Sequence, residues 1–287
     1  MSGKQYGFIP QKSTIDAGMA VKEFVESALV AGDIVVLISL DVEGAFNAAF
    51  WPSILNVLKD YSCPKNLYNL SKSYFSDRSA IISSNNIVLH KTVTKGAPQG
   101  SCCGPGYWNI QYNSLLNTPF LKHTFADDLI PAIRNSTTRA AENIANVEMT
   151  KISAWAKNNK IKFNEEKSTV MIVSRRKRKE NKEINIYINN KPIKQAINMK
   201  YLGLQIDNKF KFSEHISYTA ETCSKLIHSL SKTEKLTWGL NHKALLTIYR
   251  GAILPLLLYG APVWAKAMKY EHNRLKYITV QRLINIK

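Results

Sequence analysis

The sequence has few cysteines, no apolar run long enough for a membrane and little acidic charge. Its four cysteines have neither the CxxC spacing of a zinc site nor the density of a secreted disulfide scaffold, so we expect reduced packing residues. Residues 1–11 lack the apolar run of a signal peptide. The longest uncharged stretch near the end, residues 252–265, is shorter than a span of ~20 residues and contains two prolines. We therefore expect an intracellular protein without a membrane segment.

The excess of basic over acidic residues is confined to one part of the chain. Asp and Glu number 21 against 39 Lys and Arg, which gives a formal charge of +18. Residues 1–128 contain ten basic and ten acidic residues, whereas residues 129–287 contain 29 and 11. The whole surplus lies in the second part and favours a polyanionic partner, because neutralising phosphates releases counterions. The alternative is a solvated basic face that serves solubility.

The apolar spacing predicts helices and short strands in one globular chain. Ser13 and Asp16 form a capping-box pattern before a helix that runs to about Ala31. Residues 34–41 are apolar and β-branched, which predicts a strand buried on both faces. Further predicted elements are helices from Trp51, from Tyr107, and over 138–158, 213–235 and 241–258, a strand over 168–174, and hairpins turning at Asn85-Asn86 and Asn189-Asn190.

Three carboxylates stand at the ends of predicted strands. Asp41 ends the strand 34–41, and Asp127 and Asp128 lie between two short apolar arms that predict a tight hairpin. Phosphoryl transfer needs charge compensation at the attacking and leaving oxygens, which two magnesium ions about 3.5–4 Å apart supply. Magnesium prefers carboxylate oxygens, and these three residues offer them. The alternative for an isolated Asp-Asp pair is a polar turn.

The motifs DVEGAFNAAFW, KGAPQGSCCGP and FADDL follow one another in this order, with GFIPQKST upstream and FNEEKS and KYLGLQID downstream. This ordered set covers residues 5–207. It resembles the reverse-transcriptase domain of non-LTR (LINE-like) retrotransposons, and the first motif is most similar to that of type I insect elements that insert into ribosomal DNA. The resemblance implies an α+β polymerase palm, an antiparallel sheet backed by helices, over residues 33–207, hairpins near 79–95 and 201–207 included. It also implies partial fingers over 1–32 and a basic helical thumb over 208–287.

The resemblance implies a catalytic centre for two Mg²⁺ ions, with Mn²⁺ as a substitute. Its metal ligands are the carboxylates of Asp41, Asp127 and Asp128 and the backbone carbonyl of Val42. Lys167 of FNEEKS matches the lysine that protonates the pyrophosphate leaving group, and the alternative is an ordinary surface lysine.

The same resemblance implies contacts to the incoming nucleotide. Phe46 matches the steric gate whose ring excludes a 2′-OH, and it is also suited to core packing. Pro98, Gln99 and Gly100 match a loop over the nucleotide, where glycine lets the backbone approach closely; the alternative for Gln99 is an exposed loop residue. Lys12 matches a position near the triphosphate, and its alternative is a solvated lysine at a helix start.

Downstream residues are implied to hold the template and primer. Tyr201, Leu202 and Gly203 resemble the primer grip, a hairpin that supports the growing 3′ end. The basic run 175–179 is a nuclear-localisation patch or an RNA contact, with a solvated loop as the default interpretation. The thumb cations suited to duplex phosphates are Lys225, Lys232, Lys235, Lys243 and Arg250.

The implied function is RNA-directed DNA synthesis, with an RNA template, a DNA primer or target, and dNTPs as partners. In family members the primer is a nicked chromosomal end, so we expect a nuclear protein. Upstream finger strands and any endonuclease, ribonuclease H or cysteine/histidine motif are not recognised, so we expect a fragment of a polyprotein that carries its endonuclease elsewhere. The alternative function is a non-catalytic nucleic-acid-binding remnant of such an element.

Overall fold

The computed structural model describes residues 2–85, 87–98, 100–116, 122–175, 183–231 and 242–285. Several residues named above lie outside these ranges, so their predicted roles have no structural account. They are Asn86 of the first predicted turn, Gln99, the basic run after Arg175, and the thumb lysines Lys232 and Lys235.

A five-stranded sheet forms the centre of the molecule. Its order is β4 (Lys122–Phe125), β5 (Asp128–Asn135), β1 (Ile34–Val42), β6 (Phe163–Val173) and β9 (Lys194–Gln195). The first four strands pair antiparallel, as predicted, whereas the short edge strand β9 pairs parallel with β6. Strand β6 begins five residues before the predicted strand 168–174, because its first residues continue pairing with the end of β1.

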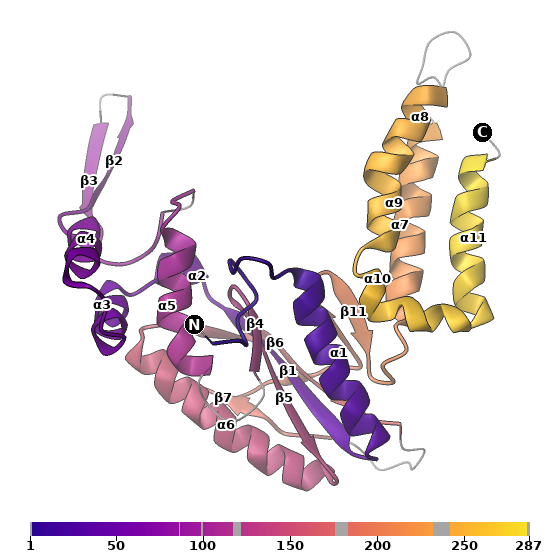
Figure 1. Ribbon diagram of the computed structural model, residues 1–287, viewed down its shortest axis with the longest axis horizontal. Helices are drawn as coiled ribbons and strands as arrows, with labels where there is room; N and C mark the ends of the chain where they lie inside the picture. The colour runs from indigo at the N-terminus through magenta and orange to yellow at the C-terminus, as the bar shows by residue number, and fades with distance from the viewer. Residues whose placement is uncertain are drawn as a thin grey trace.

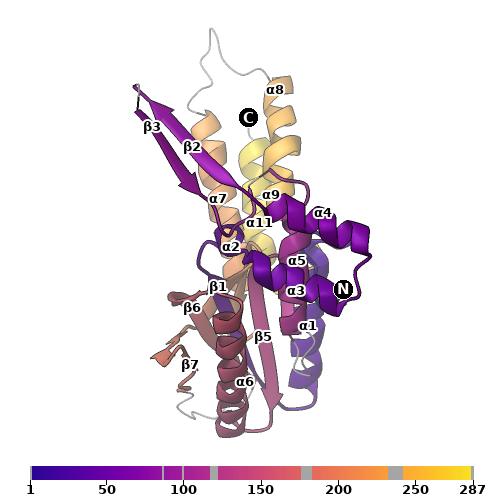
Figure 2. The ribbon, with the colours of Figure 1, turned by 90° about the vertical axis from the view of Figure 1, so that its left-hand side faces the viewer.

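Alternate residues of β1 enter two different cores, since successive side chains of a strand point to opposite faces. Val36 and Ile38 belong to the first core, with α3 (Trp51–Asp60), α5 (Gly104–Leu116) and α6 (Thr138–Asn158). Val35 and Leu37 belong to the second, with α1 (Thr14–Val30) and the C-terminal helices. Figures 1 and 2 show α6 and α1 on opposite sides of the sheet.

The predicted ends of these helices follow from local signals. Ser13 and Asp16 make both hydrogen bonds of a capping box at the start of α1. Helix α6 has the predicted bounds, and Thr137 caps it by accepting from the amide of Ala140. Helix α5 begins three residues before Tyr107, where Pro105 fits the first turn because its missing N–H would have no helical acceptor there.

Residues 45–92 form an arm beside the sheet. It contains α2 (Ala45–Ala48), α3, α4 (Lys65–Phe75) and the hairpin β2 (Ser79–Ser84) and β3 (Ile87–Thr92). The hairpin projects away from the body in Figure 1, and every strand residue in it is exposed. Ser84 pairs with Ile87 in antiparallel register, so the predicted hairpin is confirmed.

Two smaller hairpins follow β6. The first joins β7 (Tyr187–Ile188) to β8 (Lys191–Pro192), and the second joins β10 (Asn198–Tyr201) to β11 (Leu204–Asp207). Both turn residues of each have positive φ, as two-residue hairpin turns require: Asn189 51°, Asn190 64°, Leu202 47° and Gly203 80°. The predicted turn at Asn189-Asn190 is confirmed.

The C-terminal part is helical, as predicted. Its elements are α7 (Ser213–Ser231), α8 (His242–Ile248), the π-helical η1 (Tyr249–Ile253), α9 (Leu254–Leu258), α10 (Ala261–Trp264), the 3₁₀ helix η2 (Ala265–Lys269) and α11 (Glu271–Asn285). Pro255 lacks an amide donor, which accounts for the widened turn just before it. No single described helix is long and apolar enough to cross a membrane; the bent pair Leu246–Leu258 and Ala261–Lys269 passes by length and composition alone.

Helix α1, which lies in the segment assigned to the fingers, packs on the sheet. Its Val21 and Val25 share the second core with Val35 of β1 and with Ile253 and Trp264 of the C-terminal helices. The chain division at residues 32 and 207 therefore crosses a common core, and the assignment of fingers, palm and thumb stays a prediction.

Candidate active site

The register of the sheet brings Asp41 beside the Asp127-Asp128 pair. Leu40 of β1 lies opposite Leu129 of β5 in antiparallel pairing. The next residue along β1, Asp41, is therefore level with Asp128, the first residue of β5. Asp127 precedes it in the turn of the predicted β4–β5 hairpin, which is confirmed. Side chains 86 residues apart in the chain thus meet at one end of the sheet.

The three carboxylates act on one another electrostatically. Desolvation, followed by the charges of Asp127 and Asp41, raises the pKa of Asp128 to about 6. Burial and the charges of Asp127 and Asp128 also raise the pKa of the nearby Tyr112 hydroxyl. Negative charge is therefore concentrated at this end of the sheet, next to the buried parts of β1 and β5.

The donor set fits a divalent cation. Carboxylate oxygens are hard ligands, and a dication would relieve the repulsion that, after desolvation, raises the pKa of Asp128. Within the described ranges, no three His, Cys, Asp or Glu side chains are close enough to enclose an ion by themselves. Asp41, Asp127 and Asp128, with the carbonyl of neighbouring Val42, would hold the metal together with substrate oxygens and water.

A bulge in β6 faces the end of β1. The β1–β6 register shifts between Ser39 and Asp41, so the amide of Asp41 donates to the Ser168 hydroxyl at 3.2 Å instead of to a strand carbonyl. The Ser168 hydroxyl in turn donates to the carbonyl of Asn164 at 2.6 Å. Lys167 lies in this bulge with an exposed side chain, and its amide donates to the Asn164 side chain at 3.1 Å. The predicted proton donor is therefore on the strand next to Asp41.

The turn before the aspartate pair has an unusual backbone. Ala126 has φ 58°, a left-handed conformation that costs a non-glycine residue roughly 1–2 kcal/mol. Its carbonyl accepts from the Trp108 indole at 3.1 Å and from the Thr124 hydroxyl at 3.2 Å. The surrounding side chains thus hold the turn in a conformation that it would not adopt freely.

Gln5 holds the other side of this turn. Its side-chain oxygen accepts from the amides of Tyr6 and Gly7, both at 2.9 Å, and of Ala126 at 3.2 Å. Its amide nitrogen reaches the carbonyl of Ala126 at 3.5 Å. Gln5 is 2% exposed, so these bonds form away from water. The residue pattern does not single out this glutamine, because its partner is 121 positions away.

Gly7 lets the N-terminal segment lie against the turn. A Cβ on Gly7 would be 2.2 Å from the nitrogen of Ala126, closer than any real contact. The segment also pairs with β4, since the amide of Tyr6 donates to the carbonyl of Thr124 at 2.9 Å. Residues 5–7 thus form a fixed support behind the aspartate pair.

Phe46 lies on α2, which follows Asp41 and β1, and its ring contacts two other aromatic side chains. Its ring stacks on Trp108, with centroids 6.0 Å apart, and meets the edge of Phe8 at 5.9 Å. The side chain is half-buried and packs against the first core. It therefore contributes to the core, and it keeps an accessible part that a gating role requires.

A model of the family described as "Reverse transcriptase (RNA-dependent DNA polymerase)" matches residues 1–206. The chain belongs to the reverse transcriptase family. This match and the level placement of Asp41 and Asp128 agree with the resemblance of the sequence motifs.

Two relatives of this reverse transcriptase chain are retrotransposon proteins. The Pol polyprotein from type-1 retrotransposable element R1 of Bradysia coprophila is 27% identical over 99% of this chain and 28% of its own length. The RNA-directed DNA polymerase from mobile element jockey of Drosophila melanogaster is 25% identical over 98% of this chain and 31% of its own length. The chain thus spans less than a third of these relatives.

Solved structures show the same fold. Apo telomerase from Candida tropicalis matches 98% of this chain and 50% of its own, with 12% identity and a TM-score of 0.51. The predicted fold class, a right-hand polymerase with a sheet backed by helices, is thereby confirmed.

The predicted nucleotide loop of the reverse transcriptase is bonded to the helix that carries Phe46. The amide of Ala97 donates to the carbonyl of Phe46, and that of Gly96 to the carbonyl of Ala49, both at 2.7 Å. Pro98 follows directly, and Gly100 has φ 89° with open space around it. The loop therefore lies beside Phe46, although Gln99 between these two residues is outside the described ranges.

Lys12 is half-buried and hydrogen-bonded to the N-terminal segment. Its ammonium donates to the carbonyls of Gly3 and Gln5 at 2.6 and 3.0 Å and lies 4.5 Å from the ring centroid of Tyr6. These bonds tie Lys12 to the segment that supports the aspartate turn. Contact with a triphosphate stays a prediction.

The predicted primer grip lies near the aspartates. Tyr201 is 2% exposed, and burial, followed by the charge of Asp128, raises the pKa of its hydroxyl. The turn Leu202-Gly203 is fixed by Tyr259, whose hydroxyl donates to the carbonyl of Leu202 at 2.8 Å and is also hydrogen-bonded to the Thr14 hydroxyl at 3.1 Å. The hairpin is thus joined to both α1 and α9.

Proposed function

We propose that this chain is the polymerising part of an RNA-directed DNA polymerase from a non-LTR retrotransposon. It extends a DNA primer with dNTPs in the order given by an RNA template. The observation that carries the proposal is the convergence of Asp41, Asp127 and Asp128 at the end of the sheet in a chain of the reverse transcriptase family.

In the proposed reaction the 3′-oxygen of the primer attacks the α-phosphorus of a dNTP. A new P–O bond forms, the P–O bond between the α-phosphorus and the pyrophosphate leaving group breaks, and the hydroxyl proton passes from the attacking oxygen to solvent water. Two Mg²⁺ ions, or Mn²⁺, would compensate the charge on the attacking and leaving oxygens. Asp41, the carbonyl of Val42, Asp127 and Asp128 would hold these ions, and Lys167 on the adjacent β6 bulge would donate a proton to the pyrophosphate oxygen.

Selection of the nucleotide is assigned to the residues beside the aspartates. The half-buried Phe46 ring, braced by Trp108, excludes a 2′-OH, and the loop at Pro98, Gln99 and Gly100 covers the nucleotide. Lys12 would contact the triphosphate. These roles rest on the family motifs and on the placement of the described residues next to α2.

The 3′ end of the primer is assigned to the turn Tyr201-Leu202-Gly203. Lys225, Lys243 and Arg250, all exposed on the C-terminal helices, would contact phosphates of the RNA–DNA duplex. We further propose that the primer is a nicked chromosomal end, that the protein works in the nucleus, and that a longer polyprotein carries the endonuclease.

The test is Mg²⁺-dependent dNTP incorporation on a primed RNA template by the full-length protein. Replacing Asp127→Asn and Asp128→Asn should abolish incorporation, because the metal loses two charged ligands. Asp60→Asn, an exposed change at the end of α3, removes a charge elsewhere and should leave the rate unchanged.

The outcome also decides the alternative of a nucleic-acid-binding remnant. A remnant binds primed RNA in a salt-sensitive manner but incorporates nothing, even with both aspartates intact. Incorporation that survives the double substitution would instead refute the assignment of these carboxylates.

A further inference from the structure

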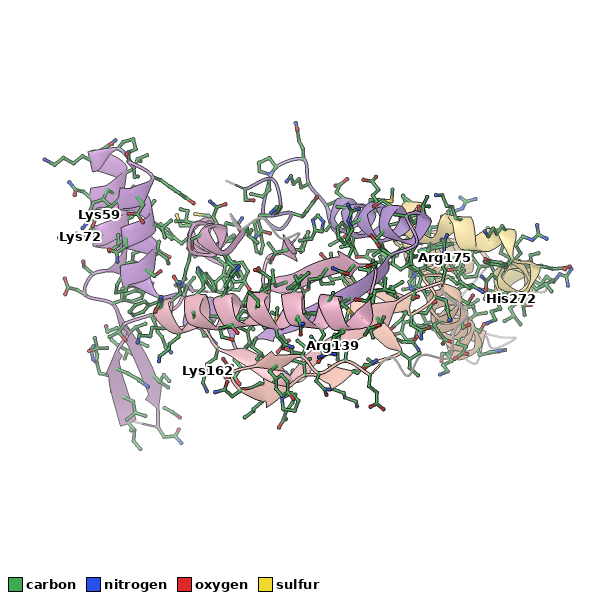
Figure 3. The ribbon with its side chains drawn as sticks, turned by 90° about the horizontal axis from the view of Figure 1, so that it is seen from below. Lys59, Lys72, Arg139, Lys162, Arg175 and His272 are labelled. Carbon is green, nitrogen blue, oxygen red and sulfur yellow. The ribbon has the colours of Figure 1, made fainter. Side chains whose placement is uncertain are left out.

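A basic cavity of about 710 Å³ lies at the base of the C-terminal helices. Its wall combines the end of α1, Arg175 after β6, the loop after β11 and the α10–η2 segment. Figure 3 places Arg175 at the same end of the molecule as His272, beside the N-terminal helix, whereas Lys59 and Lys72 are at the opposite end.

The charge of this cavity is one-sided. Five cations line it, Arg175, Lys209, Lys211, Lys266 and Lys269, against a single carboxylate, Glu26. Glu26 is already paired with Lys266 at 3.0 Å. The other four cations have no carboxylate within ion-pair distance in the part of the chain that the structure describes. Four positive charges thus face one concave space.

The loop that carries two of these cations is held rigidly. The carboxylate of Asp207 accepts from the backbone amides of Lys209 and Lys211 at 3.0–3.1 Å. Phe210 and Phe212 are buried and pack edge to face, 4.8 Å apart. The two lysines therefore stay exposed on a turn whose backbone is already fixed before binding.

An aromatic side chain stands among the lysines. Lys211 and Lys269 lie 5.7 and 5.1 Å from the ring centroid of Tyr270, and His272 stacks on it at 5.8 Å. Next to the lining residue Val263, the carbonyl of Pro262 accepts from buried Lys22 at 2.9 Å. A ligand would have to be anionic over several positions and tolerate an aromatic floor.

The cavity is remote from the aspartates. The N-terminal segment that supports the aspartate turn leads into the start of α1, whereas Glu26 is twelve residues further along the helix. A helix rises about 1.5 Å per residue, so this separation is roughly 18 Å. A strand held here would be outside the duplex that is being copied.

We propose that this cavity binds the phosphate backbone of a single nucleic-acid strand outside the copied duplex. Lysines and arginine spread over three chain segments match the repeated charges of a strand better than one isolated phosphate. The volume exceeds what a single phosphate fills, and Tyr270 offers an aromatic surface that a base tolerates. The strand would be RNA beyond the template position or DNA displaced at the target.

The experiment follows lysine acetylation by mass spectrometry. The full chain carrying Asp127→Asn and Asp128→Asn is saturated with a template–primer duplex, and short single-stranded RNA or DNA is then added. Lys209, Lys211 and Lys269 should become protected several-fold, whereas Lys59, Lys65 and Lys72 on α3 and α4 should not. The measurement needs no catalysis, so it stands even where the proposed polymerase activity fails.

A binding titration completes the test. The triple variant Lys209→Gln, Lys211→Gln and Lys269→Gln should reduce the slope of log K against log salt by about 2, since each single-strand phosphate contributes about 0.7. The control triple Lys59→Gln, Lys65→Gln and Lys72→Gln removes the same charge elsewhere.

Each remaining outcome decides the proposal. Protection by RNA alone or by DNA alone supports it and names the strand. Equal losses in the two triple variants, or no protection of the three cavity lysines, would overturn it, because the effect would then be bulk charge. Binding to phosphatidylserine vesicles but to neither oligonucleotide would also overturn it and point to a membrane surface.

Discussion

Replacement of Gln5 by leucine tests whether the N-terminal segment positions the catalytic turn. Leucine has a similar size but offers no acceptor to the three amides that the Gln5 oxygen binds. The amide of Tyr6 keeps the carbonyl of Thr124 as a second acceptor. The amides of Gly7 and Ala126 have no other acceptor among the hydrogen bonds of the described residues. Each buried, unsatisfied donor costs roughly 1–3 kcal/mol, so the free energy of unfolding should fall by about 2–6 kcal/mol.

The structure can lower this cost only by moving residues 5–7 away from the turn. That movement would release Ala126 from its left-handed conformation and displace Asp127 and Asp128. A displacement of about 1 Å at a reacting centre costs on the order of 100-fold in rate. We therefore expect kcat for dNTP incorporation to fall by about that factor, with little change in KM, because Gln5 is assigned no substrate contact.

Urea unfolding of the chain and steady-state incorporation by the full-length protein measure the two effects. Gln281→Leu makes the same chemical change at an exposed position of α11 and should alter neither the free energy of unfolding nor kcat. Thr124→Val removes one of the donors to the carbonyl of Ala126 but leaves that of Trp108, so it should cost only about 1 kcal/mol. Wild-type unfolding and wild-type kcat in the Gln5→Leu variant would refute the argument.

Three further predictions concern the site and its support. Without metal, Asp128→Asn should raise the melting temperature at pH 7.5. Its carboxyl pKa of about 6 exceeds the unfolded value near 4, so the ionised carboxylate destabilises the folded state fully above pH 6 and no longer toward pH 4. A difference in melting temperature between variant and wild type that stays the same at pH 4 would contradict this. Gly203→Ala should lower the free energy of unfolding, measured with urea, by about 1–3 kcal/mol, since φ is 80° and the new Cβ would lie 3.0 Å from the Tyr259 ring. The control Gly106→Ala, on α5 where a Cβ meets open space, should not lower it. Phe46→Val should raise the ratio of ribonucleotide to deoxynucleotide incorporation at least about tenfold, a change of 1.4 kcal/mol in discrimination, while Phe8→Leu at the rim should leave it unchanged; an unaltered ratio would leave Phe46 as a core residue only.

Local signals made much of the fold predictable. The Ser13 capping box, the β-branched run of β1 and the asparagine pair at the turn of β7–β8 each specify a short stretch through its own neighbours. The antiparallel pairing of the main strands came from the family resemblance, whereas their order was not predicted. The parallel edge strand β9 was missed, because two residues, Lys194 and Gln195, give no periodic pattern.

The aspartates of the site were predictable, but their support was not. Asp41, Asp127 and Asp128 stand in recognisable motifs, and each ends or begins a predicted strand. Gln5 and Lys12 act through backbone atoms of distant or irregular segments, and such contacts depend on how the chain packs rather than on residue spacing. The β6 bulge, where the Ser168 hydroxyl accepts from the amide of Asp41, likewise depends on the pairing of β1 with β6 and could not be predicted from either strand alone.

The second core has a consequence for folding during synthesis. It joins α1, one face of the sheet and the C-terminal helices as far as Val280. While the chain emerges from the ribosome, this core stays incomplete until Val280 has been made. One apolar face of the nascent sheet therefore stays partly exposed to solvent until α11 has been made. Chaperone binding is most useful during that interval.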